Sequence, residues 1–180
     1  MVRNRRQFLQ YMVTGTAGSL AIGLLFPTAG QSEEKVNLEK LCSAFPYNSQ
    51  CENYLPGVRA EDSEEKPIEV SAFLPNAKAG IPVLVKGLPK VAYLVINEGP
   101  KIAEYGINPV CTHLGCTVEW KTERSRFECP CHGSQFDAQG RIIKGPAKRS
   151  LPLVTVVVKQ NQIRLVDRKP AIDPRSTIKN

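Results

Sequence analysis

Short apolar or alternating runs dominate the chain from Ile68 to Val166. Turn-forming stretches separate them, among them Pro75-Asn76, Glu98-Gly99-Pro100 and Gln160-Asn161, and this punctuation is typical of β-strands. After Phe26 the sequence has no periodicity of a long amphipathic helix. The pattern predicts a mainly β fold, a small antiparallel sandwich or barrel. The predicted strands are Ile68–Leu74, Pro82–Lys86, Val91–Ile96, Thr117–Trp120, Arg126–Glu128, Arg141–Ile143, Leu153–Lys159 and Gln162–Val166.

Residues 1–32 have a different pattern, which is typical of a targeting segment. Arg5-Arg6-Gln7-Phe8-Leu9 is a twin-arginine pattern, and an apolar run follows from Tyr11 to Phe26. That run is short for the ~30 Å hydrocarbon layer of a bilayer, whereas the wider uncharged window, 7–32, is long enough to span it. We expect either a cleaved export signal or a single-span membrane anchor, with the rest of the chain carried across the membrane. A buried amphipathic helix is disfavoured because polar and apolar positions do not alternate with helical spacing.

Residues 33–66 are predicted to be a linker, because they are rich in polar residues and proline and have little periodicity. Cys42 and Cys51 lie in this segment. In the oxidising compartment that export reaches, we expect them to form a local disulfide; a second metal site is the alternative, but it would lack histidine. The folded domain is expected over residues 67–167, followed by a polar, loosely ordered tail over residues 168–180.

Composition narrows the classes of function. The chain has 180 residues, of which 42% are hydrophobic and 23% charged, which allows one packed domain with an attached segment. The net charge of +7 comes from Lys and Arg spread along the chain rather than gathered in blocks, which argues against nucleic-acid binding. Both histidines and four of the six cysteines fall between Cys111 and His132, so any histidine-dependent chemistry must lie there.

Two short loops carry these residues, Cys111-Thr112-His113-Leu114-Gly115-Cys116 and Cys129-Pro130-Cys131-His132-Gly133-Ser134. A predicted hairpin, Thr117–Glu128, should bring the loops together at its base. A zinc-stabilised binding module is one interpretation, but zinc knuckles usually pair like ligands, whereas each loop here mixes Cys with His. That mixture favours a two-iron cluster in which one iron takes two thiolates and the other two imidazoles. One further cysteine in each loop, Cys116 and Cys131, could bridge the loops.

The two loops resemble the cluster loops of Rieske iron–sulfur proteins. Tyr105-Gly106-Ile107-Asn108 and Gly145-Pro146-Ala147, on either side of the loops, are similar to the cytochrome b6-f branch of that family. The resemblance implies a Rieske-type domain with one [2Fe–2S] cluster. It also implies that Ser134 donates a hydrogen bond to the cluster, that Pro146 lies in a loop covering it, and that Cys116 and Cys131 form a disulfide. The implied iron ligands are Cys111, His113, Cys129 and His132.

The resemblance also implies a function. The chain would take one electron from a plastoquinol-like quinol and pass it to a c-type cytochrome, with proton-coupled electron transfer at His113 and His132. Its partners would be the b-type and c-type cytochrome subunits of a b6-f-like complex in a thylakoid or plasma membrane, with the domain on the lumenal or periplasmic side. Alone, the chain should show no turnover. The alternative is an exported Rieske carrier or oxidoreductase small subunit outside that complex.

Two features depart from the family pattern, one residue and one segment. Phe136 stands where high-potential members have a tyrosine whose hydroxyl bonds a ligand sulfur, so we expect a lower potential, as in a minor isoform. The glycine-rich hinge of the family is missing from residues 33–66. A linker held by a disulfide would restrict movement of the domain.

Overall fold

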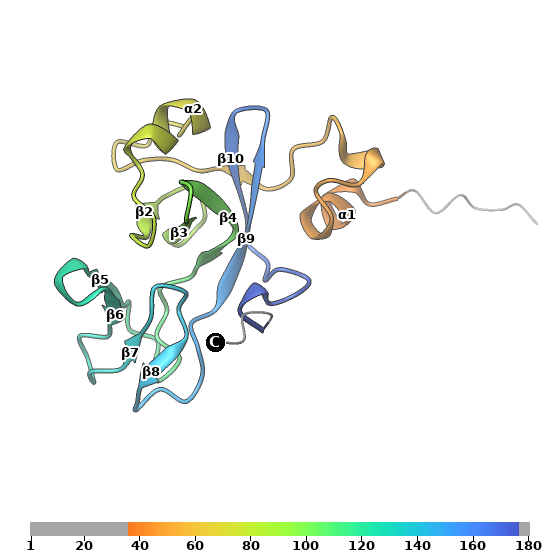
Figure 1. Ribbon diagram of the computed structural model, residues 1–180. Helices are drawn as coiled ribbons and strands as arrows, with labels where there is room; N and C mark the ends of the chain where they lie inside the picture. The colour runs from red at the N-terminus through yellow and green to blue at the C-terminus, as the bar shows by residue number, and fades with distance from the viewer. Residues whose placement is uncertain (1–35, 177–180) are drawn as a thin grey trace, which may run out of the picture. The chain divides into compact units, whose positions relative to one another are not determined.

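The computed structural model describes residues 36–176; the predicted targeting segment, 1–32, lies outside them, as do residues 177–180. The described residues form two antiparallel sheets connected by loops and short helices (Figure 1). The predicted mainly β fold is therefore confirmed. Between residues 36 and 176, no helix has the length and apolar character needed to cross a membrane.

The larger sheet has six strands. Their order across the sheet is β1 (Val58–Arg59), β10 (Gln162–Val166), β9 (Leu153–Lys159), β4 (Lys101–Ile107), β3 (Ala92–Asn97) and β2 (Val83–Val85). The smaller sheet has the order β5 (Glu119–Lys121), β6 (Arg126–Glu128), β7 (Gln135–Phe136) and β8 (Ile142–Lys144). The described helices are α1 (Leu38–Ala44) and α2 (Val70–Phe73), with 3-10 turns at Ser49–Cys51, Leu74–Asn76, Thr122–Arg124 and Pro174–Ser176.

The larger sheet separates two hydrophobic cores. Along β3, Val95 belongs to the first core and Leu94 and Ile96 belong to the second, because successive side chains of a strand point to opposite faces. The first core continues into the smaller sheet through Phe127 and Phe136, which are fully buried register partners on β6 and β7. The central strands are therefore apolar on both faces, which explains their continuous hydrophobic runs.

One predicted strand is wrong. Residues 68–74 contain α2 rather than a strand, and the helix begins where the backbone N–H of Val70 donates to the carbonyl oxygen of Asn161. Val70, Phe73, Leu74 and Ala77 pack against the second core, a spacing of three and four residues that belongs to a helix. The run is short and rich in β-branched residues at its start, so the sequence shows too few helical turns to distinguish a helix from a strand.

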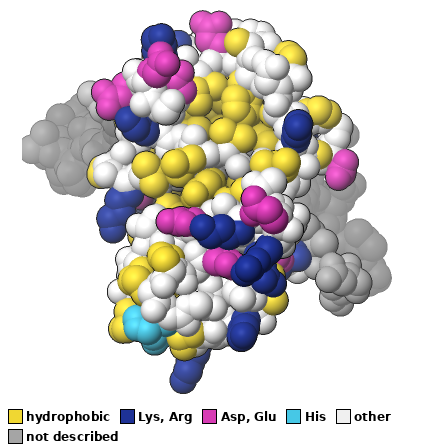
Figure 2. Space-filling model, turned by 90° about the vertical axis from the view of Figure 1, so that its left-hand side faces the viewer, with side chains coloured by type: hydrophobic (Ala, Val, Ile, Leu, Met, Phe, Trp, Pro, Cys, Tyr) yellow, Lys and Arg dark blue, Asp and Glu magenta, His cyan; other side chains and the backbone are white. Residues whose placement is uncertain are grey.

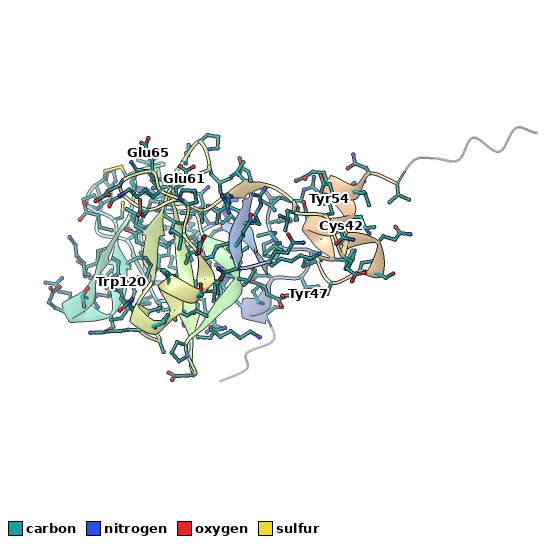
Figure 3. All side chains as sticks on the ribbon, turned by 90° about the horizontal axis from the view of Figure 1, so that it is seen from above. Cys42, Tyr47, Tyr54, Glu61, Glu65 and Trp120 are labelled. Carbon is teal, nitrogen blue, oxygen red and sulfur yellow. A yellow bond between two sulfur atoms is a disulfide. The ribbon has the colours of Figure 1, made fainter. Side chains whose placement is uncertain are left out.

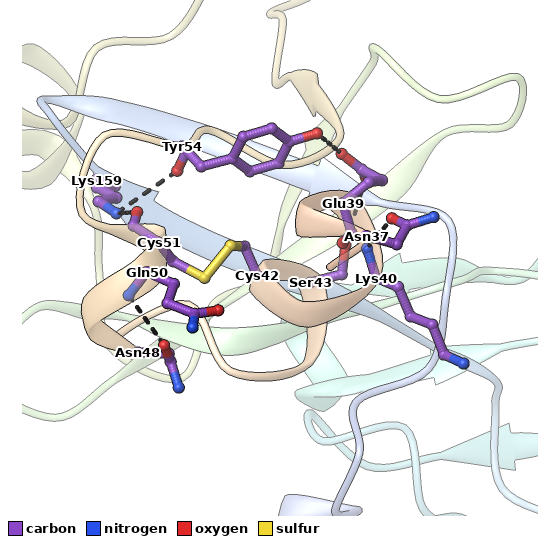
Figure 4. The surroundings of a disulfide bond; sticks show 10 residues. All are labelled: Asn37, Glu39, Lys40, Cys42, Ser43, Asn48, Gln50, Cys51, Tyr54 and Lys159. Carbon is purple, nitrogen blue, oxygen red and sulfur yellow. Dashed lines mark hydrogen bonds between the residues drawn. A yellow bond between two sulfur atoms is a disulfide. The ribbon is translucent and has the colours of Figure 1, made fainter. Parts of the chain in front are cut away.

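Residues 37–61 of the predicted linker lie on the larger sheet. β1 pairs with β10, and Ala60 is fully buried in the second core. Cys42 in α1 and Cys51 form a disulfide and are both fully buried (Figure 4). Figure 3 places Cys42 and Tyr54 on the opposite side of the domain from Trp120. This part of the chain therefore contributes to the fold, far from the hairpin between the two cysteine–histidine loops.

Glu39 ties α1 to the chain that leads into β1. Its carboxylate accepts hydrogen bonds from the Tyr54 hydroxyl at 2.8 Å and from the Gly57 N–H at 3.0 Å, and Figure 4 shows the first of these. The hydrogen bond to this carboxylate raises the pKa of the Tyr54 hydroxyl above its ordinary value. On the other side, the Lys159 ammonium group of β9 donates to the carbonyl oxygen of Cys51.

Replacing Glu39 by alanine should lower the free energy of unfolding by about 1–2 kcal/mol, because the carboxylate loses its hydrogen bonds from Tyr54 and Gly57 and a longer one, 3.4 Å, from the Ser43 hydroxyl. The measurement is urea unfolding of the oxidised protein, followed by circular dichroism. Glu52→Ala is the matched control in the same segment, because the Glu52 side chain forms no hydrogen bond or ion pair among residues 36–176. Equal losses in the two variants would contradict the assigned role of Glu39.

The expectation of a loosely ordered tail is wrong for residues 168–176. The Arg175 guanidinium donates to the carbonyl oxygen of Leu151 at 2.9 Å and forms an ion pair with Asp173 at 2.7 Å. The carbonyl oxygen of Arg168 accepts from the N–H of Thr155 at 2.7 Å. Backbone carbonyls provide most of these contacts, so no hydrophobic pattern marks them in the sequence.

Candidate metal centre

The first cysteine–histidine loop is a tight turn held by its own backbone. The N–H of Cys111 donates to the carbonyl oxygen of Cys116 at 2.8 Å, and the N–H of Gly115 donates to the carbonyl oxygen of Cys111 at 2.9 Å. Gly115 has a φ of +83°, a conformation that residues with a Cβ rarely adopt. Glycine at this position lets the loop turn back on itself.

The second loop has the same frame. The N–H of Cys129 donates to the carbonyl oxygen of Ser134 at 2.8 Å, and the N–H of Gly133, with a φ of +73°, donates to the carbonyl oxygen of Cys129 at 3.0 Å. Cys111 and Cys129 therefore occupy equivalent positions in two similar turns. The histidines do not, because His113 is the second residue after its cysteine and His132 the third.

The hairpin between the loops brings them together, as the sequence predicts. β5 and β6 pair antiparallel with Glu119 opposite Glu128, and Val110 forms an isolated bridge with Thr117 at the base of the first loop. The first loop thus leads into β5 and the second loop follows β6, at neighbouring ends of the paired strands.

Cys111 and Cys129 are the free cysteines among the described residues, and they are only 2% and 3% exposed. Burial raises the pKa of the Cys111 thiol, and the adjacent Cys129 thiol, in hydrogen-bond contact, acts in the same direction. The backbone of His113 and the Ser134 side chain oppose this shift through hydrogen bonds. Two adjacent buried thiols become thiolates readily when they coordinate a cation, so this pair has the chemistry of a metal-ligand pair.

The two histidine rings meet beside the loops. Their centroids are 4.7 Å apart and the rings are nearly perpendicular, at 86°. His113 Nδ1 is buried and has no hydrogen-bond partner among the described residues. A buried polar atom without a partner needs an explanation, and coordination to a metal supplies one. His132 is exposed. Two buried thiols, an unpartnered imidazole nitrogen and a second imidazole fit the ligand set of a [2Fe–2S] cluster of the Cys₂His₂ type.

A disulfide joins the two loops through Cys116 and Cys131, with their Cα atoms 6.5 Å apart. The sulfurs of Cys116, Cys129 and Cys131 lie within 4.8 Å of one another. They do not make a three-cysteine metal site, because the sulfurs of Cys116 and Cys131 are bonded to each other and cannot be thiolates.

A third segment covers the loops. We call residues 144–149 the proline loop, since it contains Pro146, which is exposed and follows a cis peptide bond. Ser134 is fully buried, and its Oγ accepts a hydrogen bond from the N–H of Ala147 at 2.9 Å. The Thr112 hydroxyl donates to the carbonyl oxygen of Arg149. The proline loop is thus attached to both cysteine–histidine loops.

Thr112 and Ala147 have positioning roles that the sequence does not reveal. One contact uses a backbone N–H and the other a backbone carbonyl, and backbone groups leave no residue signature. The polarity of Thr112 between Cys111 and His113 is the only available signal.

Comparison with known proteins agrees with this geometry. Residues 78–160 match the family model described as the Rieske [2Fe-2S] domain. The chain is 39% identical over 162 residues to the cytochrome b6-f complex iron-sulfur subunit of Synechococcus sp. (strain JA-3-3Ab), covering 89% of this chain and 86% of that one. It is 35% identical over 168 residues to the subunit of the same name from Prochlorococcus marinus (strain AS9601), covering 88% and 82%.

Among solved structures, the cyanobacterial plasma membrane Rieske protein PetC3 from Synechocystis PCC 6803 aligns at 41% identity with a TM-score of 0.40, covering 46% of this chain and 84% of that one. The sequence relatives match most of both chains. The chain therefore belongs to the Rieske [2Fe–2S] protein family, as an electron-transfer protein related to cytochrome b6-f iron–sulfur subunits.

Proposed function

We propose that this chain carries single electrons from a quinol to a c-type cytochrome as the Rieske subunit of a membrane complex like the b6-f complex. The observation that carries the proposal is the pair of adjacent buried thiols beside two histidine rings, one of which is exposed. The identity to subunits of that name over most of their length supports the same role.

In this proposal, Cys111 and Cys129 bind one iron, and His113 and His132 bind the other. When bound, the cluster supplies a one-electron acceptor whose potential the two neutral imidazoles raise above that of an all-cysteine cluster. The exposed ring of His132 is the group that a quinol hydroxyl can reach. Its ring nitrogen accepts the hydrogen bond of the hydroxyl and takes up the proton.

Ser134 has its hydroxyl hydrogen directed by the proline loop. Because Oγ accepts from the N–H of Ala147, its own hydrogen must point elsewhere. The Ser134 side chain is also a hydrogen-bond partner of the Cys111 sulfur. We therefore expect the hydroxyl hydrogen to point toward that sulfur. A hydrogen bond to a ligand or cluster sulfur stabilises the reduced, more negative state and raises the potential.

We also propose the arrangement of the chain around this domain. Residues 1–32 serve as a twin-arginine signal or membrane anchor, residues 33–66 connect it to the Rieske domain, 67–167, and residues 168–180 form the tail. The twin-arginine pattern and the uncharged window support this arrangement. It places the domain on the lumenal or periplasmic side of a thylakoid or plasma membrane.

A second candidate is an exported Rieske carrier or oxidoreductase small subunit outside such a complex. The observation that favours it is the attachment of residues 37–61 to the larger sheet, through the β1–β10 pairing and the hydrogen bond from Lys159 of β9 to the carbonyl oxygen of Cys51. This attachment shortens the part of the connecting segment that is free to move the domain between two partners.

Affinity purification of the tagged full chain from its native membranes separates the two functions. Co-purification of b-type and c-type haem spectra in fixed proportion to the chain is the result expected for a complex subunit. Recovery of the chain with its cluster but without haem would contradict that function and favour the exported carrier.

Phe136→Tyr should raise the midpoint potential by some tens of millivolts. Phe136 is fully buried two residues after Ser134, so a hydroxyl on its ring adds a donor near the ligand sulfurs. For a one-electron couple, 59 mV corresponds to a tenfold change in equilibrium constant, so the shift is measurable by redox titration. Phe73→Tyr, the same change against the second core, should leave the potential unchanged. An unchanged or lower midpoint in Phe136→Tyr would refute the expectation.

A further inference from the structure

The proline loop carries an unusual concentration of positive charge. Its sequence is Lys144-Gly145-Pro146-Ala147-Lys148-Arg149, and all three cationic side chains are exposed. From Cys129 to Val166 the only acidic residue is Asp137. The carboxylate of Asp137 is already paired with Arg141. It lies 3.9 Å from the Arg141 guanidinium and accepts a hydrogen bond from the N–H of Arg141 at 2.8 Å.

These cations lie next to the two loops of the metal centre. Lys148 lies between Ala147 and Arg149, the two residues whose backbones bond to Ser134 and Thr112 of the two cysteine–histidine loops. Lys144 pairs in register with Gln135, next to Ser134. The loop backbone is therefore fixed against both cysteine–histidine loops, so the three exposed charges lie along one edge of the centre. We call Lys144, Lys148 and Arg149 the basic rim.

The centre of the same surface is apolar. Leu114 of the first loop is 69% exposed, and Pro130 of the second loop and Pro146 of the proline loop are also exposed. Figure 2 shows histidine at the lower end of the molecule among hydrophobic side chains, with a Lys or Arg side chain at the extreme end. An apolar centre with a charged rim is the common anatomy of a protein docking surface.

The nearby hairpin shows that the basic rim is a distinct feature. Its cations are neutralised, because Lys121 lies 2.6 Å from Glu119, and Arg124 and Arg126 lie 3.0 Å and 2.8 Å from Glu128. Within residues 36–176, by contrast, the side chains of the basic rim form no ion pair or hydrogen bond. Exposed charges of one sign repel one another, and a partner of opposite sign relieves that repulsion.

We propose that the basic rim and its apolar centre form the docking surface for an acidic redox protein, one with carboxylates around its own redox centre. This inference rests on the proposed electron-transfer function and adds the chemistry of the acceptor. The rim draws the acidic surface toward the exposed His132, and the apolar centre makes the short-range contact. One electron leaves this chain, the partner's oxidised centre gains it, and no covalent bond forms or breaks.

A pair of probes with the same redox centre and opposite charge tests the surface. They are a basic mitochondrial-type cytochrome c and the same protein with its lysines succinylated. Electron exchange with the purified full-length holoprotein is followed by stopped-flow absorption from about 10 mM to about 0.5 M salt, a range over which the screening length falls from ~30 Å to a few Å. The second-order rate with the succinylated form should fall about tenfold or more as salt rises. The rate with the basic form should stay level or rise.

Charge reversal locates the effect. Lys148→Glu combined with Arg149→Glu should slow exchange with the succinylated cytochrome about tenfold at low salt and weaken its equilibrium binding to the immobilised cytochrome by a similar factor. The matched control, Lys78→Glu with Lys101→Glu, changes the net charge equally. Lys101 begins β4, so it lies roughly 20 Å along the strand from the end that leads to the first loop. Lys78 lies near the same far end, because Gly80 donates to the carbonyl oxygen of Ile96, beside β4.

The control should stay within about twofold of the natural chain. Equal losses in the two double variants would mean that the net charge acts rather than the basic rim, and would overturn the proposal. It would also be overturned if the Lys148 and Arg149 substitutions reduced binding to vesicles containing anionic phosphatidylglycerol but left exchange with the succinylated cytochrome unchanged. If the proposed electron-transfer function is wrong because the chain holds no cluster, the purified chain will lack a [2Fe–2S] spectrum. That result would also overturn the inference, and it is distinguishable from the rate and binding outcomes above.

Discussion

Replacing Cys129 by serine is expected to abolish the visible absorption of the [2Fe–2S] cluster in the purified protein. The Cys129 thiol is buried beside that of Cys111, so no nearby free thiol within the described residues can take its place. A serine hydroxyl is a far weaker ligand for iron than a thiolate. Iron content should fall in parallel with the absorption.

The control for this substitution uses the other end of the domain. Replacing both Cys42 and Cys51 by serine removes two cysteines that are disulfide-bonded to each other, so the cluster spectrum should be unchanged. Loss of the cluster in both variants would indicate general misfolding, and retention in Cys129→Ser would contradict the assignment of that residue.

Removing the disulfide between the two loops should destabilise the protein and loosen the cluster. Cys116 and Cys131 are 15 residues apart, and a cross-link of that length contributes about 3 kcal/mol in the loop-closure description. Cys116→Ser with Cys131→Ser should therefore lower the free energy of unfolding by about that amount. Cluster absorption should also decay faster at the same temperature, because the two loops are no longer linked beside their iron ligands.

The Cys42 and Cys51 double serine variant again provides the comparison. These cysteines close a shorter loop, with a separation of 9 residues, and the loop-closure description gives a similar loss, about 2.5 kcal/mol. We expect comparable destabilisation in chemical unfolding but a normal rate of cluster loss in the folded state. Equal rates of cluster loss in the two variants would show that the disulfide between the loops has no local effect on the centre.

The predictable part of the fold consists of elements with a complete local signal. β9 and β10 are continuous apolar or alternating runs, and their boundaries were predicted correctly from Leu153 to Val166. Gln160 and Asn161 between them both have positive φ, which matches the two-residue turns of hairpins. β6 was also predicted with its observed boundaries.

Other elements were missed because tertiary contacts define them. β4 begins with Lys101 and contains Glu104 and Gly106, so its sequence lacks the continuous or alternating apolar pattern of a strand. It nevertheless lies between β3 and β9 at the centre of the sheet. β1 and β7 have only two residues each. Elements of that length form because a neighbouring strand is already in place, and they leave no period to detect.

The candidate site was also predictable only in part. Residue types and spacing were enough to suggest the ligands, and the predicted hairpin was enough to bring the loops together. The family resemblance implied a loop over the centre that contains Pro146, but the contacts that hold this loop were not predictable, because they use backbone groups of Ala147 and Arg149. The basic rim was likewise not predictable, because the sequence does not show which cations are paired with carboxylates and which are not.

Low-temperature electron paramagnetic resonance of the reduced full chain, together with iron analysis, tests most directly whether the two loops hold a [2Fe–2S] cluster with two histidine ligands. We expect two iron atoms per chain, a [2Fe–2S] signal with a mean g value below that of the free electron, and nuclear couplings from two histidine nitrogens when histidine is labelled with ¹⁵N. Zinc in place of iron, or an iron–sulfur signal without histidine nitrogen couplings, would contradict this expectation.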